Sequence, residues 1–143
     1  MPDYLYNDLT SAILDCYYKV FNSPSSRGLT VDSLTKALVI ELRKHGLRSC
    51  QNVTISHRYD NRKIGSGRID LLVEEKVVVE IKRLTDLRER DKARLKAYLL
   101  DGGFAVGLLL NFGSEKPIHK RVYEPSHAPR PSDKAADGSG DGE

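Results

Sequence analysis

The stretch from Arg68 to Lys82, RIDLLVEEKVVVEIK, decides how this chain folds. Two nearly continuous apolar runs, 69–73 and 77–81, are rich in Val, Leu and Ile, a composition typical of strands that are buried on both faces. Residues 74–76 between the runs are all charged, so we expect a β-hairpin that closes with a three-residue loop. Each buried run contains one acid, Asp70 in the first and Glu80 in the second.

The two acids should meet across this hairpin. If the loop has three residues, Val73 faces Val77 and, three pairs further on, Asp70 faces Glu80. Directly opposed Cβ atoms lie about 4.5–5.5 Å apart, and like charges at that distance repel each other. A cation is therefore expected between the two carboxylates. Mg²⁺ is a suitable cation, because it is commonly held by one or two carboxylates together with water and phosphate oxygens.

Lys82 should lie beside the acidic pair. It is two residues past Glu80, so it projects from the same face of the same strand. Its ammonium could orient an attacking water and neutralise the charge that develops on a phosphate, while the metal acts as a Lewis acid. Two carboxylates, a divalent cation and a lysine together indicate hydrolysis of a phosphodiester.

A structural interpretation of the same residues stays open. Charged residues make up 30% of the chain, so the spacing from Asp70 to Glu80 and Lys82 can arise by chance. The acids could lie at strand ends in solvent, or pair with Arg68 and Lys82 as a ladder of salt bridges. Their place within apolar strands favours a functional site, because an unpaired buried carboxylate is costly.

The rest of the chain alternates between helical and strand patterns. Thr30 is a candidate cap for the second helix, and Asp86 with Glu89 resembles a capping box for the third. Past residue 125 the sequence is rich in Ser, Pro, Asp, Gly and Ala, so we predict one domain over 1–125 and a disordered tail over 126–143. The order is ααβββαββ, an α/β class: helices over 8–20 and 31–45, a strand over 53–59, the hairpin, a helix over 87–100, and strands over 104–110 and 118–123.

Composition narrows the class of protein. A chain of 143 residues builds one core, and none of its apolar runs reaches the roughly 20 residues that span a bilayer. The first residues lack the basic and apolar regions of a signal peptide, so a cytoplasmic protein without a membrane partner is expected. The net charge of +3 permits nucleic acid as a partner without requiring it.

The chain carries a series of short motifs in a fixed order: Gly28-Leu29, Ala37-Leu38, Glu41-Leu42, Gly46-Leu47, Arg68-x-Asp70-Leu71-Leu72-Val73, Val79-Glu80-Ile81-Lys82, Tyr98-Leu99 and Val106-Gly107-Leu108-Leu109-x-Asn111-Phe112-Gly113. Over most of residues 5–123 it is similar to the GxxExxY protein family, within the PD-(D/E)xK nuclease superfamily. The resemblance implies a restriction-endonuclease-like mixed β-sheet flanked by helices, with Asp70 and Glu80 as metal ligands and Lys82 as the catalytic lysine.

Three positions depart from the family pattern. Val31 and Leu34 stand where the family's name motif has its glutamate and tyrosine, so that helix-borne acid is missing. Glu41, at the edge of the same helix's inward stripe, is then the candidate third metal ligand; the alternative is a surface glutamate paired with Lys44 or His45. The family's Gln-x-x-x-Tyr is here Arg94-x-x-x-Tyr98.

The role of Arg94 differs between two interpretations of the function of this protein. In the first, the chain is a nuclease dependent on Mg²⁺ or Mn²⁺, with Arg94 and Arg68 holding the backbone of DNA or RNA. In the second, Arg94 pairs with Asp91 or Glu80, and the chain is a catalytically degenerate accessory that binds nucleic acid or protein. The sequence shows no element that reads bases, so specificity would require a homodimer or a partner protein.

Overall fold

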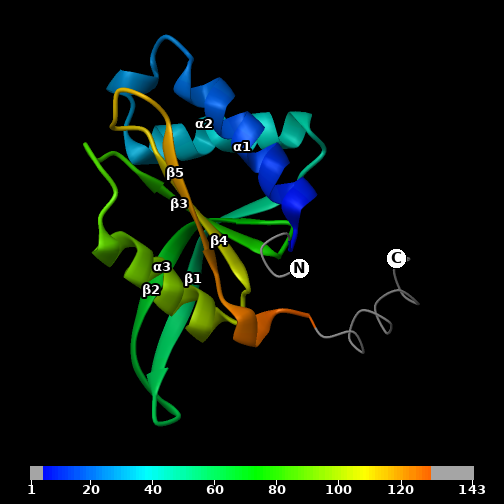
Figure 1. Cartoon of the computed structure of the whole chain (residues 1–143), viewed down its shortest axis with the longest axis vertical. Helices are drawn as coiled ribbons and strands as arrows, with labels where there is room; N and C mark the ends of the chain where they lie inside the picture. The colour runs from blue at the N-terminus through cyan, green and yellow to red at the C-terminus, as the bar shows by residue number, and fades with distance from the viewer. Residues whose placement is uncertain (1–4, 130–143) are drawn as a thin grey trace.

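The computed structural model describes residues 5–129, which form a five-stranded sheet flanked by three helices (Figure 1). The strand order is β1-β2-β3-β4-β5, and every neighbouring pair is antiparallel except β3 and β4. The predicted α/β class and the order ααβββαββ are confirmed. The elements are α1 (Asn7–Phe21), α2 (Val31–Lys44), β1 (Ser49–Tyr59), β2 (Arg62–Val73), β3 (Val77–Lys82), α3 (Glu89–Gly102), β4 (Val106–Asn111) and β5 (Ile118–Tyr123), with 3₁₀ turns η2 (Ser26–Gly28) and η3 (Pro125–His127).

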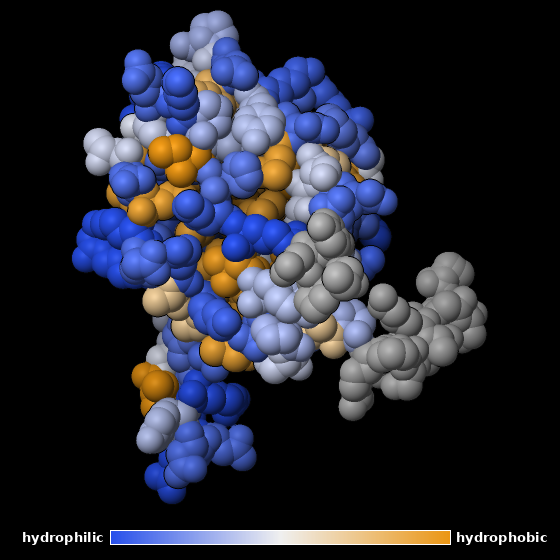
Figure 2. All heavy atoms as spheres, in the orientation of Figure 1, coloured by the Kyte–Doolittle hydropathy of each residue, from blue (hydrophilic) through white to orange (hydrophobic). Residues whose placement is uncertain are grey.

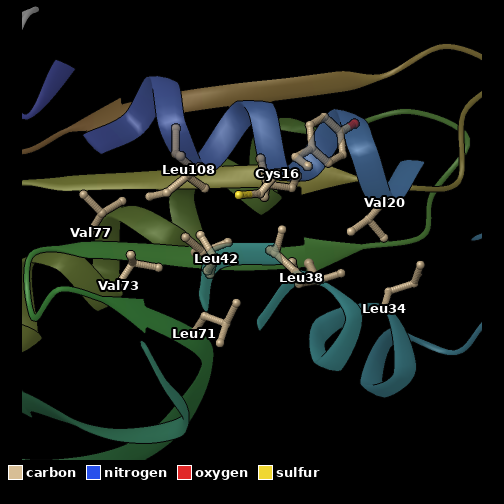
Figure 3. Close-up of a cluster of buried hydrophobic side chains, with 14 of the residues drawn as sticks. Cys16, Val20, Leu34, Leu38, Leu42, Leu71, Val73, Val77 and Leu108 are labelled. Carbon is tan, nitrogen blue, oxygen red and sulfur yellow. The ribbon is translucent and has the colours of Figure 1, made fainter. Parts of the chain in front are cut away.

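The helices lie on opposite faces of the sheet and divide the core in two. On one face, α1 and α2 pack against alternate residues of β2 and β3 (Figure 3). On the other face, α3 covers a smaller cluster that includes Val78. Because side chains alternate along a strand, Glu80 and Lys82 share the side of Val78 and point toward α3. The larger core includes Leu34, Leu38, Leu42, Leu71, Val73, Val77, Val79 and Ile81, and the smaller one Leu95, Tyr98, Leu99 and Leu109.

Local side chains fix where the helices begin. The Thr30 hydroxyl accepts a hydrogen bond from the Ser33 amide at 3.1 Å, which confirms the predicted cap of α2. The predicted capping box of the third helix is wrong, because α3 begins only at Glu89 and Asp86 accepts from Leu87 outside the helix. Asp91 replaces it: its carboxylate accepts from the Arg88 amide at 2.8 Å.

The central hairpin has the predicted register up to the acid. Val73 pairs with Val77, and Leu71 pairs with Val79. One residue further, the strands separate, because the Asp70 carboxylate accepts a hydrogen bond from the Ile81 amide at 2.7 Å. The Asp70 side chain takes the place of the next backbone acceptor of β2, and the pairing of β2 with β3 ends there.

Beyond Asp70, β2 continues with β1 alone as a long two-stranded arm, which runs past α3 toward the bottom of Figure 1. The glycine-rich approach, residues 65–67, is part of this strand. Gly67 is required there, because a Cβ at this position would overlap the Tyr98 side chain. The regular alternation of side chains in β2 is broken near Asp70, because Leu72 and Ile69 both pack in the α3 cluster although they are three residues apart. On the neighbouring strand Asn52, opposite Asp70 in the register, has φ 57°.

The chain remains structured slightly past the expected domain end. Residues 125–127 form η3, whose first turn is capped by Glu124. The remainder of the predicted tail, residues 130–143, lies outside the described residues. Between residues 5 and 129, no helix combines the length and the hydropathy needed to cross a bilayer.

Candidate active site

Asp70 and Glu80 form the acidic pair that the hairpin predicts. Glu80 is only 6% exposed, and its Oε2 atom has no hydrogen-bond partner in the described structure. Asp70 is half-buried and uses one oxygen for the Ile81 amide. Burial and the neighbouring Asp70 charge raise the pKa of Glu80 from 4.5 to about 8. Without a cation the pair therefore prefers to keep a proton at neutral pH.

Two basic side chains face this pair. Lys82 follows on the same side of β3, and Arg94 approaches from α3; their positive charges oppose the rise in the Glu80 pKa. Within residues 5–129, neither cation has a carboxylate oxygen within 4.0 Å of its nitrogens. Arg94 instead donates to the Tyr98 hydroxyl through Nε and Nη2, each at 3.3 Å. The described ion pairs thus include neither the salt-bridge ladder nor a pairing of Arg94 with Asp91 or Glu80.

A basic cleft of about 390 Å³ opens beside the acids, at the N-terminal end of α3. Lys82 and Arg94 line it together with Arg88, Arg90 and Asp91. Asp91, the only acid of this lining, is buried, yet hydrogen bonds from the Arg88 amide and guanidinium outweigh that burial and lower the Asp91 pKa. The cleft therefore presents net positive charge, which suits a phosphate.

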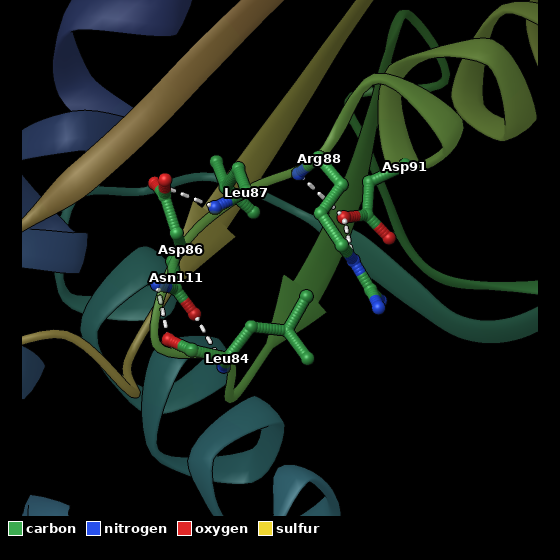
Figure 4. Close-up of polar contacts among 6 residues, drawn as sticks. All are labelled: Leu84, Asp86, Leu87, Arg88, Asp91 and Asn111. Atoms are coloured by element: carbon green, nitrogen blue, oxygen red, sulfur yellow. Dashed lines mark hydrogen bonds and ion pairs between the residues drawn. The ribbon is translucent and has the colours of Figure 1, made fainter.

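The segment that follows Lys82 is fixed at both ends (Figure 4). The buried Asn111 side chain accepts a hydrogen bond from the Leu84 backbone N–H at 2.9 Å through Oδ1. Its Nδ2 donates to the Leu84 backbone carbonyl at 2.8 Å. Gly113 is needed beside it, since a Cβ there would overlap the backbone of Arg83 and Leu84. At the other end, Asp91 holds Arg88. The distinctive Asn-Phe-Gly stretch thus anchors the backbone next to Lys82.

Glu41 does not lie beside the acidic pair. Its position contradicts the prediction that it is a third metal ligand there. It lies on α2, on the other face of the sheet, and ion-pairs with Lys44 at 3.2 Å and Lys19 at 3.7 Å. Val31, where the family acid would stand, packs against the larger core. Ten residues of helix separate Glu41 from Val31, about 15 Å of rise, so Glu41 cannot replace the missing acid.

Arg68 and Asp91 also differ from the expectation. Arg68 pairs with Thr54 on the arm and is exposed, on the side of the arm that does not carry Ile55 and the α3 contacts. Asp91 and Arg88 line the cleft but were not predicted as site residues. The signal available for Asp91 was an acid two residues into a helix, which by itself indicates only a cap.

The acidic pair is compatible with a hard divalent cation. Among the residues that the structure describes, no group of three or more His, Cys, Asp or Glu side chains is placed to hold a metal. Two opposed carboxylates, one of them with an unpartnered buried oxygen, nevertheless match the small protein ligand set of Mg²⁺, whose remaining ligands are water and phosphate. Asp70 and Glu80 are the residues that would hold it.

Comparisons with known proteins agree with this geometry. No curated protein matches the chain. The crystal structure of SSO0001 is similar, with a TM-score of 0.52 and 19% identity over 65% of this chain and 49% of that chain, so the chain spans about half of that protein's length. At this identity the likeness shows the fold alone, which is restriction-endonuclease-like. A family model described as PD-(D/E)XK nuclease superfamily matches residues 7–122, and the chain belongs to that superfamily.

Proposed function

We propose that this protein is a nuclease that hydrolyses phosphodiester bonds of nucleic acid with the help of Mg²⁺ or Mn²⁺. The observation that supports the proposal most strongly is the buried, unpartnered Glu80 oxygen beside Asp70. Two mutually repelling carboxylates, one of them buried, are costly unless a cation or a proton compensates their charge. The basic cleft next to them supplies the place for the phosphate.

The residues have separate roles in this proposal. Asp70 and Glu80 hold the divalent cation, which when bound acts as a Lewis acid on the phosphate. Lys82, anchored through its neighbouring backbone by Asn111, orients the attacking water and offsets the charge that builds on the phosphate. Arg94, with Arg88 and Arg90, holds the phosphate group in the cleft.

Nuclease activity tests the roles directly. Purified protein should nick plasmid DNA or cleave RNA with Mg²⁺ or Mn²⁺, and Asp70→Asn, Glu80→Gln and Lys82→Ala should each lower the rate by about 10²-fold or more. Glu41→Gln is the matched control, because it neutralises an acid on the opposite face of the sheet. Activity that survives in Asp70→Asn would exclude this assignment.

Metal binding has a readout that does not depend on turnover. Millimolar Mn²⁺ should raise the melting temperature of the unmodified protein, since a ligand that binds only the folded state stabilises it. Glu80→Gln should abolish this shift, whereas Glu41→Gln should retain it. An equal shift in both variants would place the metal elsewhere.

A second candidate function is favoured by the packing of Val31. An apolar residue occupies the place of the family's helix acid, and the described site has only two carboxylates. The chain would then be a degenerate nuclease fold that binds nucleic acid or a protein partner as an accessory. That alternative predicts no shift in melting temperature with Mn²⁺, but binding of nucleic acid in EDTA that Glu80→Gln strengthens.

A homodimer or a partner protein would supply sequence preference in either case, and the cytoplasm is the compartment that we expect. Size-exclusion chromatography with light scattering tests for the homodimer. A molar mass near 16.0 kDa at every concentration would leave sequence preference to a partner protein.

A further inference from the structure

The tip of the β1–β2 arm is a feature that the acidic site does not use. Residues 58–66 are nine consecutive exposed positions, and they contain three cations, Arg58, Arg62 and Lys63, against one acid, Asp60. In the described structure none of these three cations has a carboxylate oxygen within 4.0 Å. Figure 2 shows this projection as mostly hydrophilic surface with one hydrophobic patch.

Two large hydrophobic side chains at the tip are also exposed to solvent. Tyr59 is 74% exposed and Ile64 is 68% exposed, more than any other large hydrophobic side chain in the described part of the chain. Ile64 is the extra residue where the pairing shifts from His57↔Gly65 to Arg58↔Lys63, and this bulge forces it out of the regular ladder. The tip therefore presents cations next to apolar contact area.

The arm is anchored to α3 where it leaves the domain. His57 contacts Asp101 of α3 at 2.7 Å, and its ring stacks on Tyr98 with centroids 5.4 Å apart. Gly67 lies directly beneath Tyr98 on the neighbouring strand. Asp60 and Asn61, with φ of 51° and 64°, close the tip as a two-residue turn that suits the twist of a hairpin. The tip projects from this anchor as a short ribbon.

We infer that the arm is a groove-binding ribbon that selects double-stranded DNA. The inference rests on the nucleic acid substrate proposed above and names its class. The major groove of B-DNA is about 12 Å wide and admits a two-stranded β-ribbon, whereas the major groove of A-form RNA is too narrow for side chains to enter. Binding of single strands depends on rows of aromatic side chains, and the tip offers only Tyr59.

The charge of the arm argues against pairing between copies of the chain. β1 is an edge strand, so an arm could in principle add to the arm of a second molecule. That arrangement would bring six cations against two acids. Phosphates on both walls of a DNA groove are the complementary partner for the same side chains.

The length of the arm sets a minimum length for the DNA duplex. Lys63 is seven residues from Asp70 along β2, which at about 3.3 Å per residue places it about 23 Å from the acidic pair. Phosphates on one DNA strand are about 3.4 Å apart along the helix axis, so the tip reaches about seven base pairs from the cleaved bond. Shorter duplexes cannot contact both places.

Binding without cleavage tests the inference. All proteins carry Glu80→Gln and are measured in EDTA by fluorescence anisotropy with a 16-base-pair DNA duplex. Arg62→Gln with Lys63→Gln should weaken binding by about tenfold or more and reduce the slope of log K against log salt by about 2, because each lost phosphate contact contributes about 0.9. The control, Arg43→Gln with Lys120→Gln, removes the same charge from exposed positions outside the arm.

Three comparisons complete the test. The arm variant should bind a five-base-pair duplex, a single strand and an RNA duplex as well as the control does, and chromatography should show an unchanged oligomeric state. Equal losses in the arm and control variants, an equal loss on RNA or single strands, or a changed oligomeric state would each overturn the inference. Since no step requires turnover, failure of the arm is distinguishable from failure of the proposed catalysis.

Discussion

Glu80 makes the stability of the protein depend on pH. Its folded-state pKa is about 8, while an unfolded chain releases the same proton near 4.5. Between these values the folded state binds more protons, so raising the pH favours unfolding. In EDTA we expect the free energy of unfolding to fall between pH 5 and pH 8, by an amount on the order of a few kcal/mol.

Urea unfolding of the unmodified protein and of Glu80→Gln over that range measures this effect. The variant has no carboxyl to titrate at this position, so its curve should lack the decline. Parallel curves for the two proteins would show that Glu80 titrates normally. Saturating Mn²⁺ should also flatten the curve of the unmodified protein, since the carboxylates then have a cation at every pH.

Substitution of Asn111 should lower both the stability and the activity of the protein. Asn111→Leu leaves both the amide and the carbonyl of Leu84 without their partner, which costs about 2–4 kcal/mol of stability. In residual folded protein Lys82 loses its anchor, so kcat should fall while the melting shift with Mn²⁺ persists. Ser114→Ala is the milder control, because it leaves both Leu84 bonds in place and removes the 3.2 Å hydrogen bond from the Asn111 side chain and the Ser114 bond to the Lys116 carbonyl.

At the scale of elements, the loop between β2 and β3 carries conformational strain. Glu74 and Glu75 have φ of 53° and 56°, a region that costs a residue with a Cβ about 1 kcal/mol or more. Glu75→Gly should therefore stabilise the protein by about 0.5–1 kcal/mol, a rise of about 2–4 °C in melting temperature.

Glu74→Gly should not give the same gain. The Glu74 carboxylate accepts a hydrogen bond from the Arg48 amide at 2.6 Å, and that bond would be lost together with the strain. Calorimetry of the two variants separates the effects. A Glu75→Gly protein that melts at or below the unmodified protein would contradict the strain at this position.

The elements that were predicted correctly are those whose signal is local. Continuous apolar runs and a charged loop were sufficient for the hairpin, its register from Leu71 to Val73, and the proximity of Asp70 to Glu80 just past the last paired residues. The strand through Gly65 and Gly67 was missed because the need for a glycine at position 67 comes from a distant helix, through Tyr98. The side on which Glu41 lies depends equally on which face of the sheet α2 covers, and no pattern within α2 specifies that face.

The whole molecule has two cores of unequal size. Among residues 5–129, eighteen buried residues form the core beneath α1 and α2, but only seven form the core beneath α3. Regions with less buried apolar surface open at lower free energy. We expect amides of α3 to exchange with deuterium before those of α1 and β4 in native-state exchange, and Mn²⁺ to slow the exchange of β2 near Asp70. Slower exchange in α3 than in α1 would contradict this order.

The Asn111 anchor has a consequence for the life of the chain before it is complete. β3 and β4 are parallel strands separated by a helix, and such non-local pairing forms late in folding. A nascent chain that has emerged only as far as α3 carries Asp70, Glu80 and Lys82, yet lacks the residue that fixes the backbone beside the lysine. Synthesis itself therefore delays the fixing of the backbone beside Lys82 until β4 has emerged and joined the sheet.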